Sequence, residues 1–293
     1  MKHLFIINPV AGGGRALKLM PEIKRALKDR NEEFIIKITE RPEHATDIAR
    51  QHVVGEKYRV YSVGGDGTLN EVLNGVVNSG SELAVIPCGS GNDFMKSLAN
   101  INDMHSLIEK TIGGICRPID IARAGNKYFI NITSIGFDAE VAYNTNRLKK
   151  IPGIKGSMSY ILGVMATIIR CRNNYLRIKI DERQIHQKLL LIAVANGKYY
   201  GGGMKVAPDA VIDDGEFSIC LISEKGRIEI ITLLPRFIKG EHGDIEGVNF
   251  LRGRRVEIKS DKDIAINIDG ETSMIKDIVL EIIPKGINMV IPE

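Results

Sequence analysis

The stretch Gly64-Gly65-Asp66-Gly67-Thr68 constrains the fold of this chain more than any other. It follows an apolar run at Tyr58–Val63, which is typical of a buried strand, and precedes a run at Leu69–Val77 that predicts a helix. Glycines at a strand-to-helix junction leave backbone N–H groups accessible, and the helix adds its positive end, so the junction suits phosphate. Asp66 adds a carboxylate, which is expected where a divalent cation lies between it and phosphates. From these residues alone, a tight turn capped by Asp66 is the alternative.

Strands alternate with helices from residue 2 to about residue 120, which predicts a parallel α/β domain. The expected strands are Leu4–Asn8, Phe34–Ile38, Tyr58–Val63 and Leu83–Ile86. The expected helices are Arg15–Lys28, Glu43–Val53, Leu69–Val77 and a short one after Phe94.

Glycine-rich loops follow three of these strands, at Asn8–Gly14, Gly64–Thr68 and Gly89–Asp93. The carboxyl ends of parallel strands meet at one edge of a sheet, where open α/β sheets bind their ligands. Three such loops at one edge favour a phosphate-rich ligand, that is, a nucleotide site.

Short strand-like segments separated by turn residues make up the second half of the chain, which predicts a β-rich, sandwich-like domain with antiparallel pairing. The expected strands are Tyr128–Ser134, Tyr175–Ile180, Leu189–Ala195, Phe217–Ile222, Val256–Ser260, Ala265–Ile268 and Val279–Ile283. Two helical segments interrupt them, an apolar one at Gly156–Arg172 and an amphipathic one at Gly226–Gly240. The expected domains are residues 1–122 and 123–286, and a last strand within 287–293 returns to the first domain.

Composition places few limits on function. The chain is 44% apolar and 26% charged, as in ordinary globular proteins, and a net charge of +4 is too weak to indicate nucleic-acid binding. Its four cysteines are scattered without a CxxC pair, which indicates a reducing cytoplasm. No signal peptide is expected, and the apolar part of the predicted helix, Met158–Ile169, is shorter than the roughly 20 residues that span a bilayer. A cytoplasmic protein, soluble or peripheral at the inner face of the membrane, is expected.

Several nucleotide-binding classes are excluded. The chain has no GxxxxGK[ST] loop, no HRD or DFG sequence of protein kinases, and no GxGxxG followed at the right distance by an acidic residue.

An ordered set of motifs resembles the diacylglycerol kinase catalytic fold, and most closely the bacterial soluble lipid kinases. The motifs are Asn8-Pro9 with Gly12-Gly13, Thr39, Gly64 to Glu71, Gly89 to Phe94, Gly136-Phe137-Asp138-Ala139, Ala195-Asn196-Gly197, Gly201-Gly202-Gly203, Pro208-Asp209-Ala210, Asp213-Asp214-Gly215 and Asp269-Gly270-Glu271. The resemblance covers nearly the whole chain. It implies an ATP-dependent, magnesium-dependent lipid kinase with its active site between the two domains.

The resemblance also assigns residues. For the nucleotide it implies Asn8, Pro9, Val10, Ala11, Gly12, Thr39, Gly65, Asp66, Gly67, Thr68, Leu69, Asn70, Glu71 and Ser90. Asp66 would meet the magnesium of ATP, Asp120 would support it, and Glu271 would be the general base for the lipid hydroxyl. Without the resemblance, Asp269-Gly270 predicts a hairpin turn and Glu271 a solvated strand residue.

Cations and a second metal complete the implied site. Arg15, Lys96 and Lys155 match basic residues that face the transferred phosphate. Asp214, with the backbone carbonyls of Val211 and Glu216, matches a structural metal site remote from the reaction, and an ordinary Asp-Gly turn is the alternative.

Met158–Ile169 predicts a core helix or, alternatively, a path for acyl chains at a membrane, where Arg147 to Lys150 and Lys155 would face anionic headgroups. The leading acceptor is diacylglycerol, and phosphatidylglycerol, sphingoid bases and ceramide are alternatives within the family. An NAD kinase, which shares the GGDGT motif, and a non-catalytic regulator are the other hypotheses. A homodimer through edge strands is possible.

Overall fold

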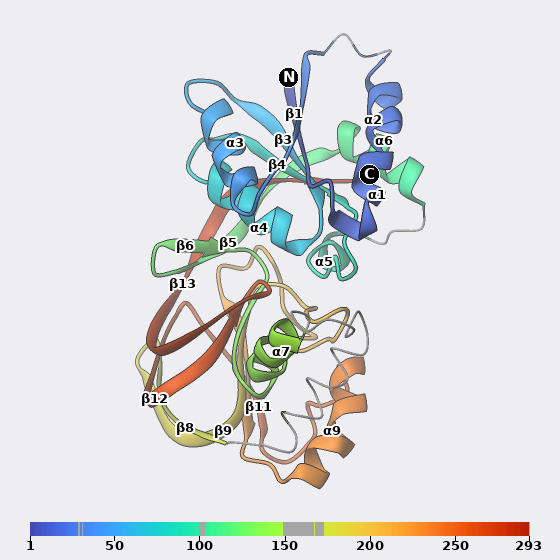
Figure 1. Ribbon diagram of the computed structural model, residues 1–293. Coiled ribbons are helices and arrows are strands. Elements are labelled where there is room, and N and C mark those ends of the chain that lie inside the picture. The colour runs from blue at the N-terminus through green and yellow to red at the C-terminus, as the bar shows by residue number, and fades with distance from the viewer. Residues whose placement is uncertain (29, 31, 100–102, 149–166, 168–172, 293) are drawn as a thin grey trace.

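The computed structural model describes residues 1–28, 30, 32–99, 103–148, 167 and 173–292. Figure 1 shows two domains stacked on one another, with the long strand β13 (Glu271–Ile291) running from the lower, C-terminal domain into the upper, N-terminal one. The predicted fold class, a parallel α/β domain followed by a β-rich one, is confirmed.

The N-terminal domain is built on a parallel sheet in the order β4-β3-β1-β2. Its elements are β1 (Lys2–Ile7), the 3-10 helix η1 (Ala11–Gly13), α1 (Arg15–Lys18), α2 (Met20–Leu27), β2 (Phe34–Ile38), α3 (His44–His52), β3 (Tyr58–Gly64), α4 (Asp66–Val76), β4 (Glu82–Pro87), α5 (Met95–Leu98) and α6 (Met104–Gly113).

Both faces of this sheet are covered, as the continuous apolar runs of its strands require. Side chains alternate along β1, so that Leu4 and Ile6 face one core, with α3 and α4, while Phe5 and Ile7 face another, with α2 and α6. The domain therefore has three layers, and the loops at the carboxyl ends of the strands stay free for a site.

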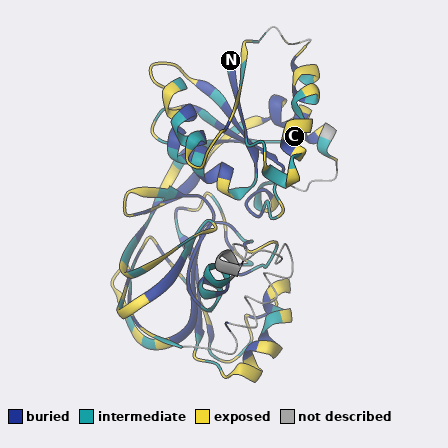
Figure 2. Ribbon diagram, in the orientation of Figure 1, coloured by how far each residue is buried: buried dark blue, intermediate teal, exposed yellow. Residues whose placement is uncertain are grey.

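The C-terminal domain is mostly antiparallel. Its elements, with the strand that leads into it, are β5 (Ile115–Ala124), β6 (Lys127–Phe129), β7 (Ile132–Gly136), α7 (Phe137–Leu148), β8 (Asn174–Ile180), β9 (Arg183–Ala195), β10 (Phe217–Ser223), α9 (Arg227–Lys239), β11 (Val248–Gly253), β12 (Arg255–Ile268) and β13 (Glu271–Ile291). One apolar core lies within the sandwich and a second lies under α9, as the buried strands in Figure 2 show.

Strand β13 joins the two domains. It begins beside β12 in the C-terminal domain, pairs with β5, and ends parallel to β4, where Asn288 lies opposite Glu82. Its register shifts between Ile283 and Ile287. At this shift the carboxylate of Asp120 accepts the N–H of Lys285 at 2.7 Å and, from another loop, the N–H of Gly215 at 2.6 Å.

Several element boundaries differ from the predictions. Two pairs of predicted strands, in 256–268 and 279–291, are single long strands with an irregular register, because turn-like residues sit inside them as bulges. The predicted strand Tyr128–Ser134 is divided into β6 and β7, and the predicted helix Arg15–Lys28 is broken at Leu19. Helices α6 and α7 and strands β5 and β11 were not predicted. The predicted helix Gly156–Arg172 falls almost entirely outside the described residues.

Candidate active site

Three glycine-rich loops meet at the carboxyl ends of β1, β3 and β4. A side-chain carbon on Gly12 would lie 2.1 Å from the carbonyl oxygen of Cys88, and one on Gly89 would lie 2.6 Å from the Cα of Gly65. These contacts are shorter than any side chain allows, so glycine is required where the loops touch. The predicted convergence of the three loops is thus present in the fold.

Side chains hold the loops together. Asn8 donates from Nδ2 to Thr68 Oγ1 at 3.0 Å, which ties the first loop to the start of α4. Arg15 donates from its guanidinium to the carbonyl oxygens of Gly12 at 3.1 Å and Gly89 at 3.4 Å. A cation and the N-terminus of α4 therefore lie at the same edge, and both favour bound phosphate.

Asp66 and Asp93 form a pair of neighbouring carboxylates beside these loops. A side-chain carbon on Gly91 would lie 3.0 Å from Asp66 Oδ2 and 3.3 Å from Asp93 Oδ2, so both oxygens border the small space above Gly91. Burial raises the pKa of Asp66, and the negative charge of Asp93 raises it further. A divalent cation would relieve this repulsion, and Mg²⁺ is commonly held by one or two carboxylates together with nucleotide phosphates. The residues present therefore fit the implied magnesium.

Asp93 also links the two domains. Its Oδ1 accepts from Lys96 Nζ at 2.7 Å, and its Oδ2 accepts the backbone N–H of Gly202 at 2.8 Å. Gly202 belongs to the glycine run 201–203 of the C-terminal domain. Asp93 and Gly202 both line a cleft between the two domains.

The cleft is lined by both domains. The N-terminal domain contributes Asp66, Leu69, Ser90, Gly91, Asp93 and Phe94; the C-terminal domain contributes Ile130, Asn131, Ile132, Ala142, Tyr200, Gly201, Gly202, Asn267, Asp269 and Gly270.

Asp269 is a third carboxylate of the cleft. Its oxygens accept the backbone N–H groups of Ile130, Asn131 and Ile132 at 2.8 to 3.1 Å. Burial raises the pKa of Asp269 to about 6, and these donors, with Asn70, oppose that rise. Asp269-Gly270 is also the two-residue turn between β12 and β13, with φ of 46° and 96°. The predicted hairpin turn is confirmed.

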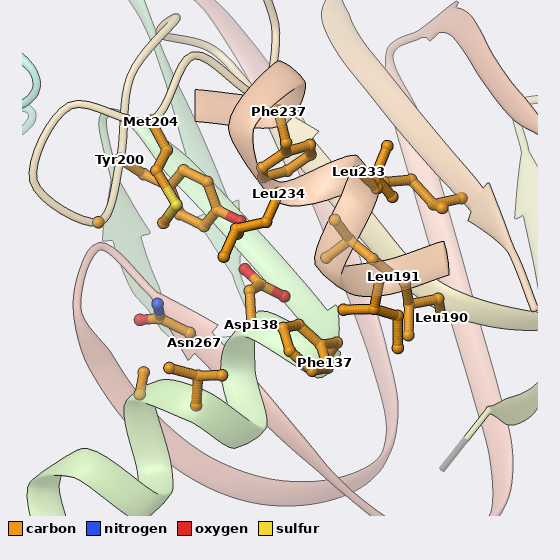
Figure 3. Close-up of a pocket in the computed structure, with 15 residues that line it drawn as sticks. Phe137, Asp138, Leu190, Leu191, Tyr200, Met204, Leu233, Leu234, Phe237 and Asn267 are labelled. Atoms are coloured by element: carbon orange, nitrogen blue, oxygen red, sulfur yellow. The ribbon is translucent and has the colours of Figure 1, made fainter. Parts of the chain in front are cut away.

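An apolar pocket adjoins the cleft in the C-terminal domain (Figure 3). Leu190, Leu191, Leu233, Leu234 and Phe237 form much of its wall, as Figure 3 shows. The pocket and the cleft share Ala142, Tyr200, Gly201 and Asn267 as lining residues, so they form a continuous site.

One carboxylate lies inside this apolar pocket. Both oxygens of Asp138 are shielded from solvent, and among the described residues no hydrogen bond of good geometry reaches them. Burial raises the pKa of Asp138 to about 6, while the nearby hydroxyls of Ser134 and Tyr200 oppose that rise.

Other predicted site residues lie away from the cleft lining. Glu271 is half-exposed, forms an ion pair with Lys127 at 3.0 Å, and lines a separate polar pocket near α3 and α4. Glu71 accepts the N–H of Ala45 at 3.1 Å and so caps α3. Asp120 uses both oxygens for the backbone contacts described above.

The predicted structural metal site has a different arrangement of charges. Asp214 forms an ion pair with Arg252, and Glu216 lies 3.8 Å from both Arg252 and Arg254. Glu216 also donates its backbone N–H to Asp214 at 3.1 Å. The carboxylate of Asp214, which the resemblance assigns to a metal, is thus paired with a guanidinium group in this structure, and the assignment of Val211, Asp214 and Glu216 as metal ligands stays a prediction. Among the described residues no cluster of three or more metal-ligating side chains occurs.

Two carboxylate residues of the cleft, Asp93 and Asp269, were not predicted as site residues. Asp93 lies within the motif Gly89 to Phe94, and a carboxylate in a glycine-rich loop is the sequence feature that could have identified it as a site residue. Asp269 was predicted to be a turn residue, and the structure confirms this. No local sequence pattern indicates that this turn contacts the N-terminal domain. Lys155 and most of Met158–Ile169 lie outside the described residues.

Comparisons with known proteins agree with the two-domain fold. Residues 2–124 match the diacylglycerol kinase catalytic domain, and residues 131–291 match the YegS C-terminal NAD kinase beta sandwich-like domain. A diacylglycerol kinase from Staphylococcus aureus is 30% identical over 91% of this chain and 84% of its own length. One from Bacillus subtilis is 29% identical over 92% and 90%. A solved structure of a Bacillus anthracis diacylglycerol kinase covers 99% of this chain and 96% of its own, with a TM-score of 0.72 at 20% identity.

The fold and the cleft together define a two-domain kinase, in which an α/β domain with three glycine-rich loops faces a β-sandwich domain. The chain belongs to the diacylglycerol kinase family, a family of lipid kinases, and this membership implies ATP as the phosphoryl donor. Within the described residues, no helix is long and apolar enough to cross a membrane.

Proposed function

We propose that the protein transfers the γ-phosphoryl group of ATP to the hydroxyl of diacylglycerol, giving phosphatidic acid and ADP. The observation that carries the proposal is the continuity of the cleft with the apolar pocket. An acceptor with a polar hydroxyl and long acyl chains needs a polar reaction centre beside an apolar compartment.

For the nucleotide, the proposal assigns the edge where the three glycine-rich loops meet. Backbone N–H groups and the N-terminus of α4 bind and orient the phosphates, and Arg15 lies at the same edge. Asp66 and Asp93 would hold Mg²⁺, which neutralises charge on the phosphates. Lys96, paired with Asp93, is proposed to face the transferred phosphate.

For the acceptor, the proposal places the hydroxyl in the cleft and acyl chain in the apolar pocket, from which the aliphatic wall excludes water. We propose Glu271 as the general base, which takes the hydroxyl proton as the oxygen–phosphorus bond forms and the bond to ADP breaks. Glu271 directly follows the Asp269-Gly270 turn, whose residues line the cleft, and its half-exposed carboxylate pairs with Lys127 in the neighbouring pocket, so the proposed role requires this side chain to leave Lys127 for the acceptor.

A panel of acceptors tests the assignment. Purified protein receives labelled ATP, Mg²⁺ and separate mixed micelles of diacylglycerol, phosphatidylglycerol, ceramide and a sphingoid base, with NAD in a parallel reaction. Label in diacylglycerol alone is the expected result. Label in another lipid would show that diacylglycerol is not the acceptor. Label only in NAD would show that the acceptor is a soluble molecule and not a lipid.

A further inference from the structure

Helix α9 is apolar on two opposite sides. On its inner side Ile230, Leu233 and Phe237 are buried in the core of the C-terminal domain, and with Leu234 they line the apolar pocket. This side accounts for the folding of the helix, because it buries apolar area against β9 and β10.

The outer side carries apolar residues that this packing does not use. Ile228 is 80% exposed, Ile231 is 56% exposed and Ile238 is 47% exposed. With the exposed Pro235 they are spaced by three, four and three residues, so they form one stripe along the helix. In Figure 2 much of the ribbon of α9 is coloured as exposed. We name Ile228, Ile231, Pro235 and Ile238 the outer stripe.

Positive charge flanks the outer stripe. Arg227 and Lys239, at the two ends of the helix, are exposed and have no ion pair among the described residues. The acidic residue of the helix, Glu229, is neutralised by Lys225 at 3.2 Å and by the N–H of Gly226 at 2.7 Å. The surface of α9 therefore presents apolar side chains between uncompensated cations, which is the pattern of helices that lie on anionic bilayers.

We propose that the outer stripe of α9, with Arg227 and Lys239, docks the protein on the surface of an anionic lipid bilayer. The position of the helix supports a bilayer as the partner, because its opposite side is the wall of the apolar pocket. Docking through the outer stripe would place this pocket next to the membrane surface, where an acyl chain could pass from the bilayer into the pocket. This last step rests on the proposed lipid acceptor, whereas docking itself does not.

Vesicle binding without substrate tests the docking. The full chain is sedimented with vesicles of phosphatidylcholine and phosphatidylglycerol that contain no diacylglycerol. The double variant Ile228→Glu/Ile231→Glu should bind at least tenfold more weakly, because two apolar contacts are replaced by charges that the anionic surface repels. The matched control is Val54→Glu, at a residue 75% exposed on the N-terminal domain, and it should bind like the wild type.

Charge is tested separately with Arg227→Gln/Lys239→Gln. Binding to anionic vesicles should weaken by about fivefold for each cation removed, and the difference should shrink in high salt. Unchanged binding of the isoleucine double variant would overturn the proposal. So would a wild-type dimer that this variant converts to monomers while vesicle binding stays the same, since the outer stripe would then be a contact between two copies.

Turnover separates this proposal from the function of the cleft. The isoleucine double variant should phosphorylate a short-chain diacylglycerol, dispersed as monomers, at the wild-type rate, and should lose at least tenfold in rate on vesicles. Loss of both rates with intact vesicle binding would contradict a docking role. If the wild type binds vesicles through α9 but phosphorylates no lipid, docking holds and the proposed acceptor fails.

Discussion

Asn70 in the N-terminal domain donates a hydrogen bond from Nδ2 to Asp269 Oδ2 in the C-terminal domain, at 3.1 Å. Asn70 lies on α4, directly after the phosphate-binding loop, and its side chain also reaches the carbonyl oxygen of Tyr128 at 3.2 Å. Because Asp269 also accepts three backbone N–H groups from residues 130–132, one carboxylate fixes the hairpin tip, the start of β7 and α4 relative to one another.

Replacing Asp269 should therefore destabilise the protein strongly. Asp269→Ala leaves several buried N–H donors without an acceptor, and we expect the free energy of unfolding to fall by about 3 kcal/mol or more. Asn70→Ala removes one donor to the same carboxylate and should cost only about 1 kcal/mol. Urea unfolding of both variants measures the difference, and equal small losses would show that the backbone donors do not depend on Asp269.

Asp138 should behave in the opposite way. Since burial raises its pKa to about 6, while an unfolded carboxyl titrates near 3.9, the folded protein binds more protons between these values. The free energy of unfolding contributed by Asp138 is thus highest below about pH 4 and falls as the pH rises through 6. Asp138→Asn, which stays neutral, should raise the free energy of unfolding by about 3 kcal/mol at pH 8.

At pH 5 the carboxyl of Asp138 is mostly protonated in the folded protein but mostly ionised in the unfolded chain, so the gain from Asp138→Asn should be about half of that at pH 8. Urea midpoints at pH 5 and pH 8 provide the comparison. A gain that is the same at both values, or larger at pH 5, would argue against a buried carboxyl that titrates near 6.

Two glycines of the phosphate-binding edge should separate packing from ligand binding. A side-chain carbon on Gly89 would collide with the Cα of Gly65, whereas nothing lies within 4 Å of one on Gly67. Gly89→Ala should lower the melting temperature, but Gly67→Ala should leave it unchanged and weaken ATP binding, because the space above Gly67 is left for phosphate. Calorimetry measures the melting temperature and the ATP affinity of both variants. Unchanged ATP affinity in Gly67→Ala would show that phosphate does not bind in the space above Gly67.

Glu271 has a kinetic prediction of its own. If its carboxylate takes the proton of the acceptor hydroxyl, Glu271→Gln should lower kcat at least about 100-fold while the KM for ATP changes little. Lys127→Gln breaks the ion pair but keeps the carboxylate, so it should retain most of the turnover. If Glu271→Gln and the wild type have comparable turnover, Glu271 is not the general base. Asp93 and Asp269, which line the cleft, would then be the next carboxylates to test.

The loops of the N-terminal domain could be predicted because their signals are local. Gly64 to Thr68 lies between an apolar strand and an amphipathic helix, and strand alternation fixes which ends of the strands share an edge. The same local information predicts the hairpin turn at Asp269-Gly270 from its residue types.

The remaining parts of the site depend on contacts between distant residues. Nothing near Asp269 indicates that its carboxylate meets Asn70, 199 positions earlier in the chain. Strand β13 was divided in two by the turn-like residues Pro284 and Lys285, which the structure accommodates as an irregular step held by Asp120. Arg252, which pairs with both Asp214 and Glu216, likewise lies in strand β11, 38 positions after Asp214, so no local pattern near Asp214 indicates these ion pairs.

The proposed reaction transfers phosphate from ATP to a lipid hydroxyl at the Asp66–Asp93 pair. The most direct measurement is the initial rate of label transfer from ATP to diacylglycerol by the wild type, beside Asp66→Asn and Asp93→Asn variants of unchanged melting temperature. We expect transfer by the wild type and a loss of at least about 100-fold in each variant, since each removes one proposed magnesium ligand. Absence of transfer by the wild type, or transfer undiminished in both variants, would contradict the account.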